Sequence, residues 1–118
     1  MTVRGLHRLI VSVAEMDRAL AFYRDALGFA EKYRAGDAVV LTVDGTGLEL
    51  LLHQRPPTPG PAGIAASFLV DDVDTATAAA RQGGGTVVDA PADQPWGERQ
   101  SVLTDPDGHV ICLVAATT

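Results

Sequence analysis

The stretch VAEMDRA at residues 13–19 recurs in altered form as VDDVDTA at residues 70–76. Each stretch follows an apolar segment and opens a segment whose apolar spacing is that of an amphipathic helix. Met16 and Val73 are equivalent in the two stretches and lie 57 positions apart. The later stretches VVLTVDG, residues 39–45, and SVLTDPDG, residues 101–108, also resemble each other. A repeat of this kind predicts two similar half-domains that share a core, with a cleft between them.

Length and composition predict one acidic domain spanning residues 1–118. Nine Lys and Arg against fifteen Asp and Glu give a net charge of −6, which argues against a nucleic-acid partner. The single cysteine, Cys112, excludes an intrachain disulfide. No stretch is apolar enough to suggest a leader or a membrane span, so we expect a cytoplasmic protein without a membrane partner.

The apolar pattern predicts the element order βαβββ twice. In the first half, the helix is expected at residues 15–27 and ends at Gly28, which suits the left-handed position after a helix. Asp44-Gly45 is expected to form a hairpin turn. The strands of this half are expected at residues 6–13, 30–34, 37–43 and 47–53.

The second half follows a linker rich in Pro and Gly at residues 54–63. Its helix is expected at residues 73–82, with Asp71 or Asp72 as the N-cap. Three glycines at residues 83–85 follow this helix rather than precede one, which favours a structural role over a phosphate-binding loop. The strands are expected at residues 64–70, 86–89, 98–104 and 109–115, so that module one covers about residues 3–53 and module two about residues 64–116.

Two further motifs lie in the two halves. The first is AFYRDALGF at residues 21–29, and the second is PWGER at residues 95–99 followed by DPDGHVI at residues 105–111. Together they resemble the signatures of the vicinal oxygen chelate superfamily, which includes glyoxalase, bleomycin-resistance and extradiol dioxygenase-like proteins. The resemblance implies an α+β fold of two tandem βαβββ modules, whose strands form a cupped mixed sheet with helices on its outer face, usually completed by a partner chain.

In metal-dependent members, four side chains at pseudo-symmetric positions hold one divalent ion. The resemblance places these positions at Arg8, Ala65, Glu49 and Cys112. Only Glu49 is an ordinary ligand for a hard cation, because a guanidinium stays protonated and alanine has no donor. The sequence therefore predicts no metal and no cofactor. One alternative is that a bulge in the first strand puts His7 in the place of Arg8.

Without a metal, Glu49 is the side chain expected to be central to the site. It lies between Leu48 and Leu50, so on a strand it points to the face that its neighbours avoid. We expect an ion pair between Arg8 and Glu49, and Glu49 is the candidate general base if the protein is an enzyme. Cys112 is expected to be a buried, inert thiol rather than a nucleophile.

Other side chains are expected to line the same cleft as ligand-binding residues. Trp96 lies in a loop where it either stacks on a flat ligand or anchors the loop, and Arg99 can pair with an anionic ligand. His53 is expected at the rim and His109 on the outer face. The full expected ligand-binding set is Arg8, Ile10, Ser12, Glu49, Leu51, Ser67, Trp96, Arg99 and Cys112.

Two functions fit a cleft without a metal. The first is a small-molecule binding protein resembling the bleomycin-resistance type, which sequesters an antibiotic or metabolite in the cleft of a homodimer. The second is a glyoxalase-like lyase, isomerase or dioxygenase that uses Glu49, and that depends on a metal if His7 replaces Arg8.

Overall fold

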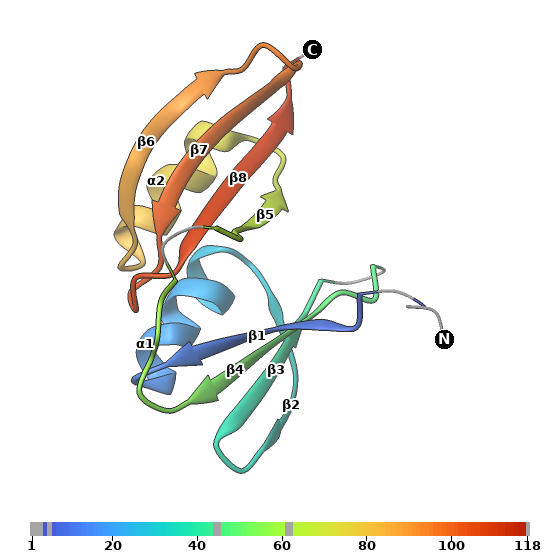
Figure 1. Ribbon diagram of the computed structural model, residues 1–118, viewed down its shortest axis with the longest axis vertical. Coiled ribbons are helices and arrows are strands. Elements are labelled where there is room, and N and C mark those ends of the chain that lie inside the picture. The colour runs from blue at the N-terminus through green and yellow to red at the C-terminus, as the bar shows by residue number, and fades with distance from the viewer. Residues whose placement is uncertain (1–3, 5, 44–45, 61–62, 118) are drawn as a thin grey trace.

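The fold consists of two four-stranded mixed sheets with few helices (Figure 1). The computed structural model describes residues 4, 6–43, 46–60 and 63–117, so the turn expected at Asp44-Gly45 lies outside the described residues. The strand orders are β1-β4-β3-β2 and β5-β8-β7-β6, which confirms the expected α+β fold of tandem βαβββ units. No helix in the described part of the chain has the length and apolar character needed to cross a membrane.

Module one contains the sheet from β1 to β4. Strand β1 pairs with β4 in parallel, and the other neighbours are antiparallel. The expected helix forms as one continuous segment, but its second part has the wider π-helical pattern, with Leu27 N–H donating to Phe22 C=O at 3.0 Å. The elements are β1 (Arg8–Val13), α1 (Met16–Leu20), η1 (Ala21–Ala26), β2 (Ala30–Ala35), β3 (Ala38–Thr42) and β4 (Glu49–Gln54).

Module two contains the sheet from β5 to β8 and repeats the pairing pattern of module one. Asp72 is the N-cap of its helix, because its side chain accepts a hydrogen bond from Thr75 N–H at 3.0 Å. Strand β6 is longer than expected and contains two register shifts. The elements are β5 (Ala66–Leu69), α2 (Val73–Gln82), β6 (Thr86–Asp93), β7 (Glu98–Thr104) and β8 (Val110–Ala116).

The core lies where the helices cover one face of each sheet. Alternate strand residues such as Leu50 and Leu52 are buried there against Phe22 and Tyr23. Their neighbours Glu49 and Leu51 point to the opposite, open face, because side chains alternate along a strand. This alternation separates a helix-covered face from an open face in both modules.

Glycines allow the helical layers of the two modules to meet. A Cβ atom at Gly83 would lie 2.6 Å from Ala26 Cβ, and one at Gly85 would lie 2.7 Å from the Phe22 ring. Any larger residue would force the modules apart at this contact. The three glycines after α2 therefore have the structural role that the sequence indicated.

The turn between β7 and β8 fastens module two to module one. The buried Asp105 carboxylate accepts a 2.6 Å hydrogen bond from the Tyr23 hydroxyl and also accepts from two N–H groups of its own turn. Asp107 pairs with Arg18 at 2.7 Å. His109 Nε2 lies 2.7 Å from the Ser12 carbonyl oxygen, so the expectation that His109 lies on the outer face is wrong. The DPDGH motif thus sets the relative position of the modules.

Candidate functional site

A carboxylate bound by two cations lies on the open face of the module-one sheet. Arg8 lies directly opposite Glu49 in the parallel pair of β1 and β4. Its Nη2 and Nε atoms donate to Glu49 Oε1 at 2.6 and 3.1 Å, which confirms the expected ion pair. Lys32 Nζ donates to Glu49 Oε2 at 2.6 Å. We call Arg8, Lys32 and Glu49 the ion cluster.

Lys32 reaches the ion cluster because β2 contains a bulge. The pairing of β2 with β3 shifts register between Glu31 and Tyr33, which leaves Lys32 as the extra residue. A bulge turns a side chain away from the direction that strict alternation would give it. Lys32 is not among the residues expected at the site, because alternation alone does not mark the position of a bulge.

Both cations hold Glu49 in its ionised form. The hydrogen bond from Lys32, followed by that from Arg8, lowers the pKa of the Glu49 carboxyl, and its burial opposes this effect. The same contact with Glu49 is the main cause that raises the pKa of Arg8. A carboxylate stabilised in this way is a weak base, because taking up a proton would break two charge-assisted hydrogen bonds.

The residues at the ion cluster do not fit a divalent metal. Each Glu49 oxygen already binds a cationic nitrogen, and neither Arg8 nor Lys32 offers a lone pair at neutral pH. The pairing of β1 with β4 runs in register from Arg8 to Val13, so the bulge that would bring His7 into the place of Arg8 does not form. Among the residues described, no three His, Cys, Asp or Glu side chains lie close enough to share a metal ion.

The corresponding face of module two has different chemistry. Cys112 lies opposite Ser67 in the pair of β5 and β8, whereas Ala65 precedes β5. Ala65 and Cys112 are therefore not paired as Arg8 and Glu49 are. Burial, with a smaller contribution from Asp89, raises the pKa of the Cys112 thiol, so it stays protonated at neutral pH. A protonated thiol is a poor nucleophile and a poor metal ligand.

Trp96 and Arg99 lie at the outer end of module two, where β6 turns into β7. The Trp96 ring is 62% exposed, and its Nε1 donates to Glu98 Oε1 at 2.9 Å. Arg99 pairs with Asp74 at 2.9 Å and with Asp93 at 3.0 Å. Within one chain, neither residue belongs to the sheet that contains the ion cluster.

Of the other ligand-binding residues expected in module one, Ser12 is buried in a contact with the linker, whereas Ile10 and Leu51 lie on the open face of the sheet. Ser12 is buried, and its hydroxyl accepts a hydrogen bond from Thr58 N–H at 3.2 Å, so it serves the contact between linker and sheet. Ile10 is exposed, and Leu51 is half-buried beside it on the open face. His53 accepts a hydrogen bond from Arg55 at 3.0 Å near the start of the linker.

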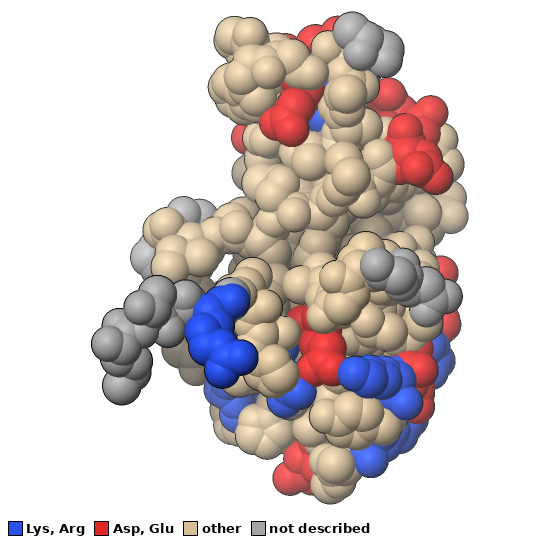
Figure 2. Space-filling model, turned by 90° about the vertical axis from the view of Figure 1, so that its right-hand side faces the viewer, with Lys and Arg blue, Asp and Glu red and all other residues tan. Residues whose placement is uncertain are grey.

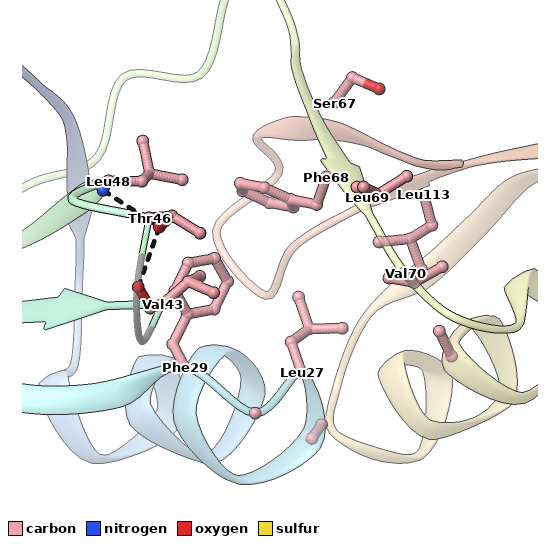
Figure 3. A pocket seen from close by; sticks show the side chains of 13 residues that line it. Leu27, Phe29, Val43, Thr46, Leu48, Ser67, Phe68, Leu69, Val70 and Leu113 are labelled. Carbon is pink, nitrogen blue, oxygen red and sulfur yellow. Dashed lines mark hydrogen bonds between the residues drawn. The ribbon is translucent and has the colours of Figure 1, made fainter. Parts of the chain in front are cut away.

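A cavity lies between the modules rather than on an open sheet face (Figure 3). Its volume is about 470 Å³, and the residues that the structure describes along its walls have no ionisable side chain. The Phe29 and Phe68 rings meet edge to face there, with centroids 5.2 Å apart. Its main apolar lining residues are Leu27, Phe29, Leu48, Phe68, Leu69 and Val70.

Of the expected ligand-binding residues, only Ser67 lines this cavity. The other lining residues were not expected there, because strand alternation and the helical pattern assign most of them to the core. Leu27 is the C-cap that follows η1, and Phe68 points to the helix-covered side of β5. A cavity between two modules depends on how the modules are packed, which no local pattern reports.

Known proteins share both the sequence family and the fold. Residues 5–113 match the family model for the Glyoxalase/Bleomycin resistance protein/Dioxygenase superfamily. The "Putative glyoxylase CFP32" proteins of Mycobacterium bovis and Mycobacterium tuberculosis are each 37% identical over 111 residues, covering 83% of this chain. The alignment covers only 39% of the length of these relatives.

Solved structures show the same architecture. A superfamily member from Sphaerobacter thermophilus is 27% identical, with a TM-score of 0.75 over 95% of this chain and 97% of that one. A glyoxalase-related enzyme from Fulvimarina pelagi has a TM-score of 0.81 over 95% of this chain and 88% of that one. At 17% identity, the second similarity concerns the fold alone.

Proposed function

The chain belongs to the Glyoxalase/Bleomycin resistance protein/Dioxygenase superfamily, and we propose that within it the chain is a metal-free binding protein for small organic molecules. In this proposal it resembles the bleomycin-resistance type and sequesters an antibiotic or metabolite rather than converting it. The principal support is the apolar cavity of about 470 Å³ between the modules. Its size and walls are those of a site for a medium-sized organic ligand.

The ion cluster supports binding rather than catalysis. Glu49 is the acidic residue best placed for general-base chemistry, but Arg8 and Lys32 each neutralise one of its oxygens. Cys112 has its pKa raised and therefore lacks the thiolate that a nucleophile needs. Glu49 as a base and Cys112 as a nucleophile are thus both weakened by their surroundings.

We also propose that the chain acts as a homodimer. Strands β1 and β5 each lie at the edge of a sheet and offer unpaired backbone groups. Ile10 and Leu69 on these strands are exposed apolar residues, which a symmetric partner would bury. Sedimentation at micromolar concentration tests this part of the proposal, and a monomer would contradict it.

N-phenyl-1-naphthylamine, a neutral apolar fluorophore, tests the cavity directly. Without added metal and in the presence of EDTA, we expect saturable binding of one probe per chain. Ala76 lines the cavity, so Ala76→Phe should reduce the affinity by about tenfold or more, because it fills the space that the probe needs. Ala78→Phe is the matched control, since Ala78 is exposed on the same helix.

The same measurements can overturn the proposal. Equal affinity in the Ala76→Phe and Ala78→Phe variants would place the probe outside the cavity. Stoichiometric Ni, Zn, Mn or Fe that survives dialysis, with Glu49 among its ligands, would contradict the metal-free part.

A glyoxalase-like enzyme is the second candidate, because the curated relatives named glyoxylase are 37% identical over the matched region. In that case a hemithioacetal of glutathione and methylglyoxal should be converted, and Glu49→Gln should abolish the conversion. Turnover that depends on Glu49 would replace the binding proposal.

A further inference from the structure

We propose that the ligands of this protein are neutral, unbranched aliphatic alcohols of medium chain length, each held across two adjoining cavities between the modules. The first, here called the large cavity, is the apolar cavity of about 470 Å³ beside Phe29. The second, here called the small cavity, has a volume of about 170 Å³. This inference rests on the proposed function, because it requires that the large cavity binds an apolar molecule.

The two cavities lie end to end in the layer of apolar side chains between the modules. In module one, Leu48 lines the large cavity, and Leu50, two residues later, lines the small one. In module two, Leu113 lines the large cavity, and Ile111 of the same strand lines the small one. Two residues of extended chain span roughly 7 Å. The cavities are therefore neighbours along both of their walls.

The side chain of Phe68 separates the two cavities. Among the described residues, Phe68 is the one that lines both. Its ring projects from β5 toward Phe29 and meets that ring edge to face, with centroids 5.2 Å apart (Figure 3). Phe68 is only half-buried, and an edge-to-face pair is a weak contact. When the Phe68 ring turns aside, the two cavities join into one elongated site.

This elongated site favours a neutral aliphatic chain. A molecule that spans both cavities has to pass the Phe68 ring, and a polymethylene chain is the narrowest apolar group that can do so. The described walls of the large cavity have no ionisable side chain. A carboxylate or ammonium group would lose its hydration there without gaining a partner, which is costly.

The surface between the modules has the same apolar character. In Figure 2 the molecule is hollowed between its upper half, module two, and its lower half, and the side chains along this hollow are mostly uncharged. Gly28 and Thr46 are exposed at the rim of the large cavity and belong to neither β1 nor β5. A partner chain over the edges of β1 and β5 would therefore leave this entrance open, and the alcohol would reach the small cavity through the large one.

The small cavity offers an acceptor for the hydroxyl group. Its walls include the polar side chains of Tyr23 and His109. The Tyr23 hydroxyl already donates to Asp105 at 2.6 Å. His109 Nε2 lies 2.7 Å from the Ser12 carbonyl oxygen, which can only accept, so Nε2 carries the proton and Nδ1 of the neutral ring is an acceptor. No described residue bonds to this Nδ1 atom, so the hydroxyl group of an alcohol can donate to it.

Filling one cavity at a time tests whether one molecule spans both. Ala76 lines the large cavity and not the small one, and Ala66 lines the small cavity and not the large one. Ala76→Phe and Ala66→Leu should each weaken the binding of 1-decanol by about tenfold, because about two methylenes lose their place and each contributes roughly fourfold. N-phenyl-1-naphthylamine, which occupies the large cavity alone, should be weakened by Ala76→Phe only. Isothermal titration measures the alcohol, and fluorescence measures the probe.

Ala65→Leu is the matched control for Ala66→Leu, because Ala65 is exposed and lines neither cavity. Unchanged binding of N-phenyl-1-naphthylamine shows that both variants are folded. If these two variants bind 1-decanol equally well, the alcohol does not enter the small cavity, and this inference is wrong while the proposed function stands. If the wild type does not bind N-phenyl-1-naphthylamine, the proposed function fails and this inference fails with it.

A series of ligands tests the chemical class. From 1-hexanol to 1-decanol the affinity should rise by about fourfold for each added methylene, as expected when every methylene is buried. At neutral pH, 1-decanol should bind at least about tenfold more tightly than decanoate, because the carboxylate finds no cation in either cavity. An affinity that stops rising before 1-decanol, or equal affinities for 1-decanol and decanoate, would overturn the assignment to neutral alcohols.

Discussion

The two modules have the same strand order and pairing but differ in charge and in the residues of their open sheet faces. Residues 1–63 contain seven basic and seven acidic residues, whereas residues 64–118 contain two basic and eight acidic ones, so the whole net charge of −6 belongs to the second half. At the parallel strand pair, module one has Arg8 opposite Glu49 and module two has Ser67 opposite Cys112. The helix-covered residues of both modules are therefore constrained by packing in the core, whereas the residues on the open face of each sheet can differ without changing the fold.

The largest expected effect comes from breaking the contact that joins the modules. Asp105→Ala leaves the Tyr23 hydroxyl and two N–H groups of the turn without their acceptor. It should lower the free energy of unfolding by about 3 to 5 kcal/mol, because a buried charged acceptor is removed and its donors stay behind.

Urea denaturation measures this effect. Asp93→Ala is the control, since Asp93 is exposed in the same module and should change stability by no more than about 0.5 kcal/mol. Similar values for the two variants would mean that the modules do not depend on this turn.

Overfilling the contact between the helical layers should have the next largest effect. Gly85→Ala would place a Cβ atom 2.7 Å from the Phe22 ring and should cost about 1 to 3 kcal/mol, the usual range for overpacking. Gly60→Ala has open space around its Cβ and serves as the control. Thermal unfolding of both variants measures the difference, and an undiminished melting temperature for Gly85→Ala would exclude tight packing here.

The ion cluster, which module two lacks, predicts that the stability of the protein depends on pH. The folded-state pKa of Glu49 lies below its ordinary value of 4.5, so the ion cluster stabilises the protein above that value and loses its effect as pH falls through the lower folded pKa. Glu49→Gln should therefore reduce the melting temperature at pH 7, and its difference from the wild type should shrink in acid.

Glu31→Gln provides the comparison for this prediction: Glu31 pairs with Arg34 and Arg24 on an exposed part of the same module, which also lowers its pKa, but the loss of melting temperature at pH 7 should be smaller than for Glu49→Gln because exposed ion pairs contribute little. Melting temperatures between pH 7 and pH 3 decide the question. If the difference in melting temperature between the wild type and Glu49→Gln were the same at every pH, the ionisation of Glu49 would not contribute to the pH dependence of stability.

The smallest effect is expected at Trp96. Its ring is exposed at the outer end of module two and does not line the cavity. Trp96→Ala should leave the affinity for N-phenyl-1-naphthylamine unchanged and alter stability by no more than about 0.5 kcal/mol. Titration and melting of the same variant measure both quantities, and a tenfold weaker affinity would return Trp96 to the binding site.

Several local features were predictable from the sequence alone. The helix at residues 73–82 and the strand at residues 98–104 appear as expected, and the cap is Asp72, one of the two expected aspartates, because capping, apolar spacing and breaker residues act over a few neighbouring positions. The Arg8–Glu49 pair was also expected, since the resemblance to the superfamily implies that both residues occupy neighbouring metal-ligand positions.

Other features depended on how distant segments meet. The bulge that brings Lys32 to Glu49 arises from the pairing of β2 with β3. His109 turned inward because its turn packs against Ser12 of the other module. Ser67 rather than Ala65 pairs with Cys112, since β5 begins at Ala66. Local patterns contain no information about such long-range register.

The sequence by itself determined the order of the two βαβββ units and the approximate bounds of most of their elements, because these depend on residue type and short-range periodicity. Only the tertiary structure decided the place of the cavity, the second cation on Glu49 and the role of the DPDGH turn. The physical reason is that each arises from contact between segments far apart in the chain. Their relative placement is set by packing at Gly83 and Gly85 and by the hydrogen bonds of Asp105.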